Sequence, residues 1–329
     1  MAYFMDRRTF FLGLTGVAGT LMTSGGSWAA GELASKAMPK RVLGRTNQQV
    51  SILGLGTAPM GHASVGEEAA ASIIHAALDQ GINYIDTARV YDNSESYLSK
   101  VTRDRRDEMF LVTKVWADSA ARAEESLTTS LKTLGVDHVD LCHIHSMGNR
   151  NPEEVLADDG ALAYLLKAKE KGLTRCVGIT GHHKVSNYPP VLDTGKIEVL
   201  MVNLNFVDGH AYKFREHVLP VAKKHGTAVV AMKVFAGRNM GEAKNFMANY
   251  RRPGPPQMPG DLLRDSLHYC LSLDGVTTAL TGVYNRDEIL ENSRWAKEFQ
   301  PMTAEKMKTL EERGKEIAPS WGLRFGEPD

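Results

Sequence analysis

Short apolar runs rich in β-branched residues recur along the chain and alternate with stretches of helical spacing. Each of the first seven runs precedes a segment whose apolar residues return every three or four positions, as at Leu127, Leu131 and Leu134. Strands that alternate with helices predict an α/β fold with a parallel sheet, and eight of them predict a closed (β/α)8 TIM barrel. The eight runs are Ser51–Gly56, Ile82–Asp86, Met109–Lys114, His138–His145, Thr174–Thr180, Glu198–Asn205, Ala228–Val234 and Val276–Thr281.

Two additions to the barrel are expected. Arg41–Val50 predicts an N-terminal hairpin that turns on Gly44 and Asn47 and closes the barrel floor. After the eighth run, Asp287–Lys297 and Thr303–Ile317 predict two helices, the second being extra to the barrel. An open doubly wound sheet is the alternative fold, but it needs a G-x-G-x-x-G turn after an early strand, and the sequence contains none.

The first thirty residues differ from the rest. Arg7 and Arg8 precede a weakly apolar, glycine-rich stretch, and Ser27-Trp28-Ala29 offers a small-x-small cleavage site. The pattern resembles a twin-arginine export signal, whereas a first amphipathic helix is disfavoured by its many glycines. We therefore expect a signal peptide over residues 1–29, a linker over 30–40 and one domain over 41–329. Passage through the twin-arginine machinery would make the protein periplasmic or otherwise exported.

Composition excludes several other functions. Lys plus Arg and Asp plus Glu both number 39 among 329 residues, so the net charge gives no indication of nucleic-acid binding. No run of about 18 apolar residues occurs, so no membrane span is expected. The three cysteines form no C-x-x-C motif, which gives no support for structural zinc or an iron–sulfur cluster. Their apolar neighbours favour buried thiols, with a Cys142–Cys176 bridge left open.

Ionisable side chains stand at the carboxyl ends of four predicted strands. Asp86, Lys114, His145 and Lys233 lie at or next to the ends of the second, third, fourth and seventh runs. In a (β/α)8 barrel these ends converge on one face, where catalytic groups lie. Charge is costly in an apolar sheet unless it is paired or used, so four such ends predict an active site.

These groups suit proton transfer to a carbonyl oxygen. Tyr91 follows Asp86 by five residues, and a phenol normally titrates near pH 10. An ammonium from Lys114, held by Asp86, would favour the phenolate and make Tyr91 a usable proton donor. His145 could then hydrogen-bond the carbonyl oxygen as negative charge develops. Because no side chain supplies a hydride, a nicotinamide cofactor is implied.

Three stretches carry a specific resemblance. Gly81–Tyr91 with Asn93-Ser94-Glu95, Leu111–Lys114, and Ser130–Asp137 leading into Asp140–His145 resemble the signature of the aldo-keto reductase family. The resemblance extends over about Arg41 to Ala318 and indicates a divergent bacterial branch. It implies that a catalytic tetrad is formed by Asp86, Tyr91, Lys114 and His145.

The same resemblance implies a binding site for NADP(H), with NAD(H) left open. Departures occur at Thr180-Gly181, where the family often has Ser-Asn, at Met201, where it has Gln, and at Met232, which takes the ring-stacking position. The strand-eight loop and helix from Gly282 resemble the family's nucleotide-phosphate site. The expected cofactor residues are Gly56, Thr57, Asp86, Thr180, Gly181, Met201, Met232, Lys233, Val234, Phe235, Gly282, Tyr284, Arg286, Glu288, Glu291 and Asn292.

The expected function is interconversion of an aldehyde, ketone or sugar and its alcohol, with Trp116 and His182 near the substrate. An exported enzyme would need tightly held nucleotide, recycled by a second substrate or a redox partner. One alternative is a nucleotide-binding sensor or regulatory subunit with little turnover. The other is a metal-dependent barrel hydrolase, because His143 and His145 point to the same strand face.

Overall fold

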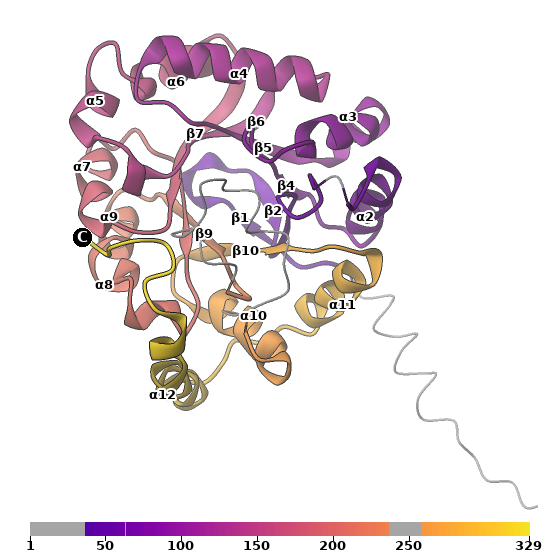
Figure 1. The fold of residues 1–329 in the computed structure, drawn as a ribbon, viewed down its shortest axis with the longest axis vertical. Coiled ribbons are helices and arrows are strands. Elements are labelled where there is room, and N and C mark those ends of the chain that lie inside the picture. The colour runs from indigo at the N-terminus through magenta and orange to yellow at the C-terminus, as the bar shows by residue number, and fades with distance from the viewer. Residues whose placement is uncertain (1–36, 63, 237–257) are drawn as a thin grey trace, which may run out of the picture. The chain divides into compact units, whose positions relative to one another are not determined.

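The computed structural model describes residues 37–62, 64–236 and 258–329. Eight parallel strands form a closed barrel in which β10 pairs with β3, as the sequence pattern predicts (Figure 1). The strands are β3 (Leu53–Gly56), β4 (Tyr84–Asp86), β5 (Phe110–Val115), β6 (Val139–Ile144), β7 (Thr174–Gly181), β8 (Val199–Asn203), β9 (Ala228–Met232) and β10 (Val276–Gly282).

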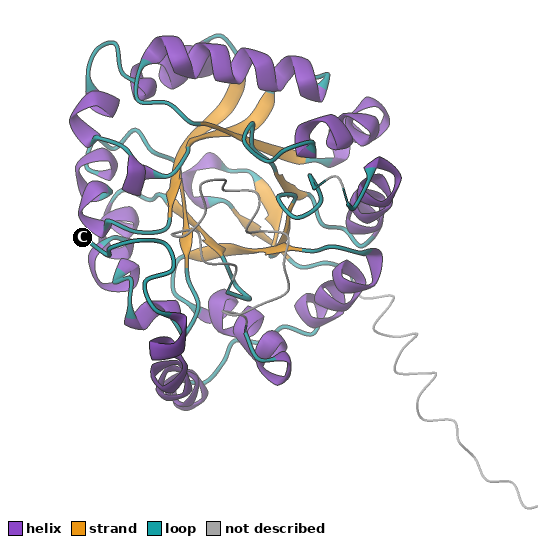
Figure 2. Ribbon diagram, viewed as in Figure 1, coloured by secondary structure: helices purple, strands orange, loops and turns teal. Residues whose placement is uncertain are grey.

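Helices surround the barrel (Figure 2). Their buried apolar residues share one core cluster with apolar residues of the strands. In α4, for example, Ala123, Leu127 and Leu134 are buried at helical spacing, and burial of each leucine contributes about 1.5–3 kcal/mol. The α-helices are α2 (Glu67–Asp79), α3 (Ser94–Arg105), α4 (Ala120–Leu134), α5 (Pro152–Leu156), α6 (Ala161–Glu170), α7 (Pro189–Leu192), α8 (Phe214–His217), α9 (Leu219–Lys224), α10 (Leu263–Ser272), α11 (Arg286–Lys297) and α12 (Ala304–Trp321). Short 3-10 helices are Gly44–Thr46, Arg106–Glu108, Met147–Asn149, Val185–Asn187, Asp208–His210 and Gly260–Leu262.

The predicted hairpin is present and closes the floor. Its strands β1 (Lys40–Val42) and β2 (Gln49–Ser51) pair antiparallel, and Leu43 packs into the apolar cluster inside the barrel. Gly44 has φ +50°, and a Cβ there would lie 2.8 Å from the backbone nitrogen of Ala228, so only glycine fits this turn. Ser51 belongs to this hairpin, which shortens the first predicted barrel strand.

The apolar core has an inner and an outer layer. Cys176 belongs to the cluster inside the barrel, and Cys142 to the larger cluster beneath the helices. Both are free thiols, so the Cys142–Cys176 bridge that the sequence left open does not form. Burial raises the pKa of Cys176 to about 12. Among the described helices, none is both long and apolar enough to cross a bilayer.

Candidate active site

Asp86 and Lys114 form a buried ion pair at the mouth of the barrel. Asp86 ends β4, and Lys114 lies in β5, two residues beyond the Val112 that pairs with Asp86. Lys114 Nζ donates to Asp86 Oδ2 at 2.7 Å and to the Thr87 carbonyl at 2.8 Å. The side chains are 1% and 2% exposed. Parallel pairing of two neighbouring strands therefore brings the acid and the ammonium together, as predicted.

Burial acts on both partners of this pair in opposite directions. It raises the pKa of Asp86 and lowers the pKa of Lys114, because each charged form loses water. The opposite charge 2.7 Å away opposes both shifts and stabilises the ionised pair. Asp86 Oδ1 has no hydrogen-bond partner among the described residues.

Tyr91 lies over this ion pair. Its loop between β4 and α3 is held by hydrogen bonds from Tyr91 N to the Ala88 carbonyl (3.0 Å) and from Ser94 N to the Tyr91 carbonyl (2.8 Å). The Lys114 ammonium lies 4.7 Å from the centre of the Tyr91 ring, and that ring is 9% exposed. A cation this close favours negative charge on the phenol, so the arrangement suits a tyrosine that donates a proton.

His145 faces Tyr91 from the end of β6. Its ring lies edge-on to the Tyr91 ring at 5.9 Å and to the Trp116 ring at 5.2 Å. Burial, together with the Lys114 charge, holds the pKa of His145 well below its usual range. The imidazole is therefore neutral near pH 7 and can donate one N–H to a carbonyl oxygen. The four predicted catalytic side chains thus lie together at the mouth.

Trp116 is the most accessible of the rings at the mouth. Its side chain is 38% exposed, and the Arg150 guanidinium lies 4.8 Å from its ring. Arg150 is itself paired with Asp118 at 2.5 Å. The Trp116 ring is therefore held between Arg150 and His145. Its contact with substrate stays a prediction.

Two buried polar atoms on the neighbouring strands β7 and β8 have no hydrogen-bond partner in the described part of the chain. Thr180 Oγ1 in β7 and Asn203 Oδ1 at the end of β8 have no hydrogen-bond partner among the described residues. The paired strands bring them near each other, since Thr180 aligns with Met201. Met201 is fully buried in the interior cluster, and Gly181 packs on Tyr188. Sequence reasoning placed Thr180 in the cofactor site and assigned no role to Asn203; the two unpartnered oxygens, Thr180 Oγ1 and Asn203 Oδ1, fit the hydrogen-bonding needs of a carboxamide.

Gly56, Thr57 and Gly282 lie at the adjoining strand ends. Gly56 ends β3 and pairs with Gly282 of β10 on one side and with Asp86 on the other. Thr57 Oγ1 donates to the Asp86 carbonyl at 2.9 Å, which ties β3 to the strand that carries the acid. A Cβ on Gly282 would lie 2.8 Å from Pro59, so its backbone lies close to the β3 loop.

The residues predicted to bind the cofactor at the end of β9 and in the turn after it lie in different layers of the core. Met232 belongs to the barrel interior, whereas Val234 belongs to the outer layer. Phe235 packs on Trp295 of α11, with ring centres 6.3 Å apart. Of these residues, only Lys233 is charged. Its ammonium adds to the larger effects of burial and of the Lys114 charge, which lower the pKa of His145. The side chains of Val234 and Phe235 thus pack in the outer layer, and a nucleotide contact by either residue stays a prediction.

The start of α11 carries two acidic side chains, which disfavour a phosphate there. Glu288 accepts from Tyr284 N and from Asn285 Nδ2, both at 2.8 Å, and its own amide donates to Asn285 Oδ1 at 3.0 Å. Asp287 lies in the same first turn, and Arg286 is the basic residue beside them. The carboxylate of Glu288 thus already satisfies amide donors that a phosphate would use.

The remaining two residues predicted from α11 point in different directions. Asn292 is buried and donates to Thr281 Oγ1 of β10 at 3.3 Å. Glu291 lies on the exposed face, where Arg294 is 3.4 Å away. Asn292 therefore supports the strand end, and a nucleotide contact by Glu291 stays a prediction.

His182 lies at the mouth against the C-terminal segment. Its ring lies 4.8 Å from the Phe325 ring, and burial and the Lys233 charge hold its pKa well below the usual range. His143 is fully buried beside Gly178 in the next strand. The described residues hold no group of three His, Cys, Asp or Glu side chains placed to bind a metal ion, which leaves the hydrolase alternative without a site there.

Sequence reasoning assigned no role to two buried carboxylates near the mouth. Glu95 accepts a hydrogen bond from Oγ1 of Thr113, the residue before Lys114, at 2.7 Å. Burial raises the pKa of Glu95. Asp208 is paired with Arg324 at 2.6 Å. Glu95 lay within the stretch that resembles the family signature, which was a usable signal; Asp208 and Arg324 carried none.

A closed barrel with this tetrad at its mouth defines a carbonyl oxidoreductase. Residues 52–261 match the Aldo/keto reductase family, and the chain therefore belongs to it. The chain is 25% identical over 314 residues to the uncharacterized oxidoreductase YqkF of Bacillus subtilis (strain 168), covering 85% of this chain and 97% of that one. It is 25% identical to L-galactose dehydrogenase of Arabidopsis thaliana, covering 77% and 86%.

Solved structures agree with the fold. The holo form of aldo-keto reductase AKR11C1 from Bacillus halodurans superimposes with a TM-score of 0.68 at 26% identity, over 84% of this chain and 96% of that one. A putative aldo-keto reductase from Pseudomonas aeruginosa, PA4992, gives a TM-score of 0.64 at 26% identity, over 82% and 98%. The family and the tetrad make this chain an NAD(P)-dependent oxidoreductase that acts on carbonyl compounds and their alcohols.

Proposed function

We propose that Tyr91 donates the proton to the carbonyl oxygen during reduction and removes it during alcohol oxidation. The observation that carries this role is the buried Lys114 ammonium, 4.7 Å from the Tyr91 ring and fixed by Asp86 at 2.7 Å. A cation there stabilises the phenolate that remains after donation. A nicotinamide nucleotide held at the mouth would supply or take up the hydride.

In this proposal His145 orients the substrate. Its neutral ring donates a hydrogen bond to the carbonyl oxygen, where negative charge builds during reduction. A protonated imidazole would compete with Tyr91 as the acid, so the lowered pKa of His145 keeps the two roles separate. Trp116 and His182 are proposed to contact the substrate from two sides of the mouth.

The choice between NADP(H) and NAD(H) depends on α11. The sequence resemblance predicts NADP(H), but Glu288 and Asp287 occupy the first turn beside Arg286. A second negative group at this helix start would meet the Glu288 carboxylate, which lowers the gain from the helix dipole. We therefore propose that NADH is bound at least as well as NADPH.

The proposed location outside the cytoplasm rests on residues 1–29, which lie outside the described residues. Twin-arginine export carries folded proteins, so the nucleotide would enter the periplasm already bound. We propose tight nucleotide retention, with recycling by a second substrate or a redox partner. Periplasmic protein that contains no nucleotide and binds NADH and NADPH only weakly would contradict this part of the proposal.

The test of catalysis compares the unchanged chain with Tyr91→Phe, which keeps the ring but removes the hydroxyl. Both are mixed with NADH or NADPH and a panel of aldehydes, ketones and sugars. We expect turnover by the unchanged chain, a loss of about 10²–10⁴-fold in Tyr91→Phe, and equal nucleotide affinity in both. Tight nucleotide binding without turnover of any carbonyl would instead favour the sensor alternative.

A further inference from the structure

The turn that follows β9 has an unusual backbone. Lys233 has φ +58° and Ala236 has φ +82°, a region that residues with a Cβ rarely adopt. Such conformations persist only where surrounding contacts hold them, and they concentrate at functional sites. The turn includes Lys233, whose charge reaches His145 and Asp86 at the mouth. Its support is therefore informative about the site.

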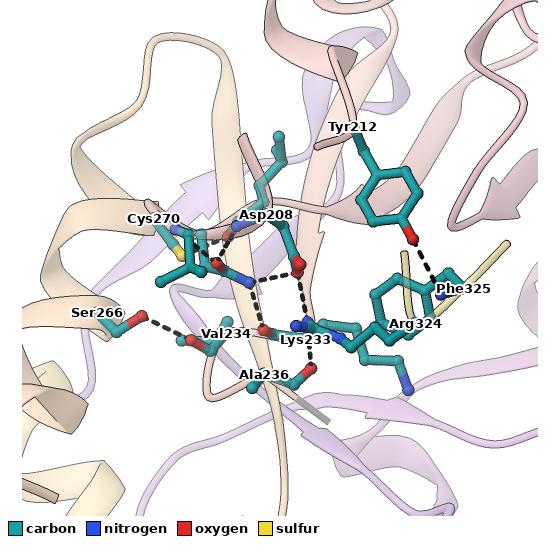
Figure 3. A network of polar contacts seen from close by, with 12 residues as sticks. Asp208, Tyr212, Lys233, Val234, Ala236, Ser266, Cys270, Arg324 and Phe325 are labelled. Carbon is teal, nitrogen blue, oxygen red and sulfur yellow. Dashed lines mark hydrogen bonds and ion pairs between the residues drawn. The ribbon is translucent and has the colours of Figure 1, made fainter. Parts of the chain in front are cut away.

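Three carbonyls of this turn are bound by three separate parts of the chain. Asn205 Nδ2, after β8, donates to the Lys233 carbonyl at 3.0 Å. Ser266 Oγ of α10 donates to the Val234 carbonyl at 2.6 Å. Arg324, in the C-terminal segment, donates to the Ala236 carbonyl at 3.1 Å (Figure 3).

Arg324 also bridges to the neighbouring support. Its Nη2 lies 2.6 Å from Asp208 Oδ2, the oxygen to which Asn205 Nδ2 donates at 2.6 Å. The side-chain oxygen Oδ1 of Asn205 in turn accepts from the Val207 and Asp208 amides at 2.9 and 2.8 Å. The guanidinium therefore links the two ends of the turn, Ala236 directly and Lys233 through Asp208 and Asn205.

The C-terminal segment is itself firmly held. Arg324 is 1% exposed, and the rings of Trp321 and Phe325 lie 4.2 and 4.5 Å from its guanidinium carbon. Farther along, Lys184 N donates to the Glu327 carbonyl at 3.3 Å, in the loop after β7. The segment thus runs between the β7 and β9 loops as a fixed support.

We propose that Arg324 is a positioning residue for the nucleotide: it holds the Lys233–Ala236 turn in the conformation that presents Lys233 and the turn's backbone to the cofactor. The inference rests on the proposed function, which places the nicotinamide nucleotide at this mouth. A buried guanidinium with two acceptors is suited to the task because its planar donors fix direction as well as charge. Lysine at this position would keep the charge but lose the planar arrangement of N–H donors.

The test compares Arg324→Gln with Arg324→Lys, and uses Arg313→Gln as a matched control. Arg313 is an exposed arginine whose ion pair with Glu316 lies within α12. Hydrogen exchange of the Ala236 amide, which donates to the Lys233 carbonyl at 2.9 Å, reports the turn without any cofactor. Dissociation constants for NADH and NADPH are measured on the same samples.

For Arg324→Gln we expect exchange at Ala236 to accelerate and the nucleotide dissociation constant to rise at least tenfold. We also expect kcat at saturating nucleotide to change less than threefold, because the tetrad does not touch Arg324. Arg324→Lys should lie between the two, and Arg313→Gln should match the unchanged chain. Faster exchange with unchanged nucleotide affinity would overturn the positioning role, and so would unchanged exchange.

Arg324→Gln leaves Asp208 buried without its cation, so the single variant could fail to fold. The double variant Arg324→Gln with Asp208→Asn removes both charges and keeps a polar pair. We expect it to fold and still to show the weakened nucleotide binding, and full nucleotide affinity would overturn the inference. If the unchanged chain binds neither nucleotide, the proposed function and this inference both fail, while faster exchange at Ala236 would still identify Arg324 as a support of the turn.

Discussion

Replacing Asp86 with Asn removes one charge from a pair that lies almost wholly out of water, while the side chain keeps its volume. The amide oxygen of Asn can still accept from Lys114 Nζ, and the Thr87 carbonyl, 2.8 Å away, still accepts as well. The loss is therefore the charge pairing, which leaves a buried ammonium unbalanced. Breaking a buried pair costs about 3–5 kcal/mol, and the retained acceptors favour the lower end, about 3 kcal/mol at neutral pH.

The loss of stability in Asp86→Asn should depend on pH. Without Asp86 the folded-state pKa of Lys114, already lowered by burial, falls further below its unfolded value of about 10.4. Between these two values the unfolded chain binds more protons than the folded one, so the stability of the variant rises with pH. The deficit is therefore largest near neutrality and shrinks as the pH approaches 10.

Urea denaturation followed by circular dichroism at pH 7 and pH 10 measures both parts. The control is Asp274→Asn, because the Asp274–Lys223 pair is exposed and we expect its loss to leave the midpoint unchanged at either pH. A deficit of equal size at pH 7 and pH 10, or none at pH 7, would refute the reasoning. Turnover should fall with Asp86→Asn at neutral pH, because an unpaired Lys114 loses the charge that assists Tyr91.

Three further predictions concern other parts of the mouth and the core. Glu288→Gln should improve NADPH binding relative to NADH by about two- to fivefold, measured as a ratio of dissociation constants, and no change would place the 2′-phosphate elsewhere. His145→Ala should lower kcat by about 10²–10³-fold. Because the pKa of His145 is held well below its usual range, protonation of His145 should not lower the rate of the unchanged chain between pH 8 and pH 6. A loss of rate near pH 6.5 that disappears in the variant would contradict this. Cys142 and Cys176 should resist a thiol reagent until urea unfolds the chain, and rapid labelling of the native protein would show that their burial is incomplete.

The barrel could be predicted because its signal is local. Each strand is a short apolar run, each helix a periodic segment, and parallel pairing then fixes which strand ends meet. Asp86 and Lys114 came together for that reason, since their strands are neighbours in the sheet. Tyr91 and His145 needed the family resemblance as well, because loop conformation and ring orientation cannot be read from periodicity.

The parts that were missed depend on contacts between distant segments. Ser51 continues the apolar run toward Gly56, and only its pairing with Lys40 assigns it to the hairpin. The direction of Glu288 depends on the amides that happen to be free at its helix start. Arg324 lies 116 residues from Asp208, in a tail with no apolar period, so its burial carries no signal in the sequence.

The two buried ion pairs of the mouth are linked by a third cation. Asp86 ends β4 and Asp208 lies in the 3-10 helix that follows β8, and they are paired with Lys114 and Arg324 respectively. Burial raises the pKa of both carboxyls and the Lys233 charge opposes that rise, so Lys233 lies within electrostatic reach of each pair. Cationic side chains at a barrel mouth favour an anionic ligand, and a dinucleotide with two phosphates is such a ligand. The support of the Lys233 turn by Arg324 and the chemistry of Asp86 and Lys114 are therefore two parts of one site.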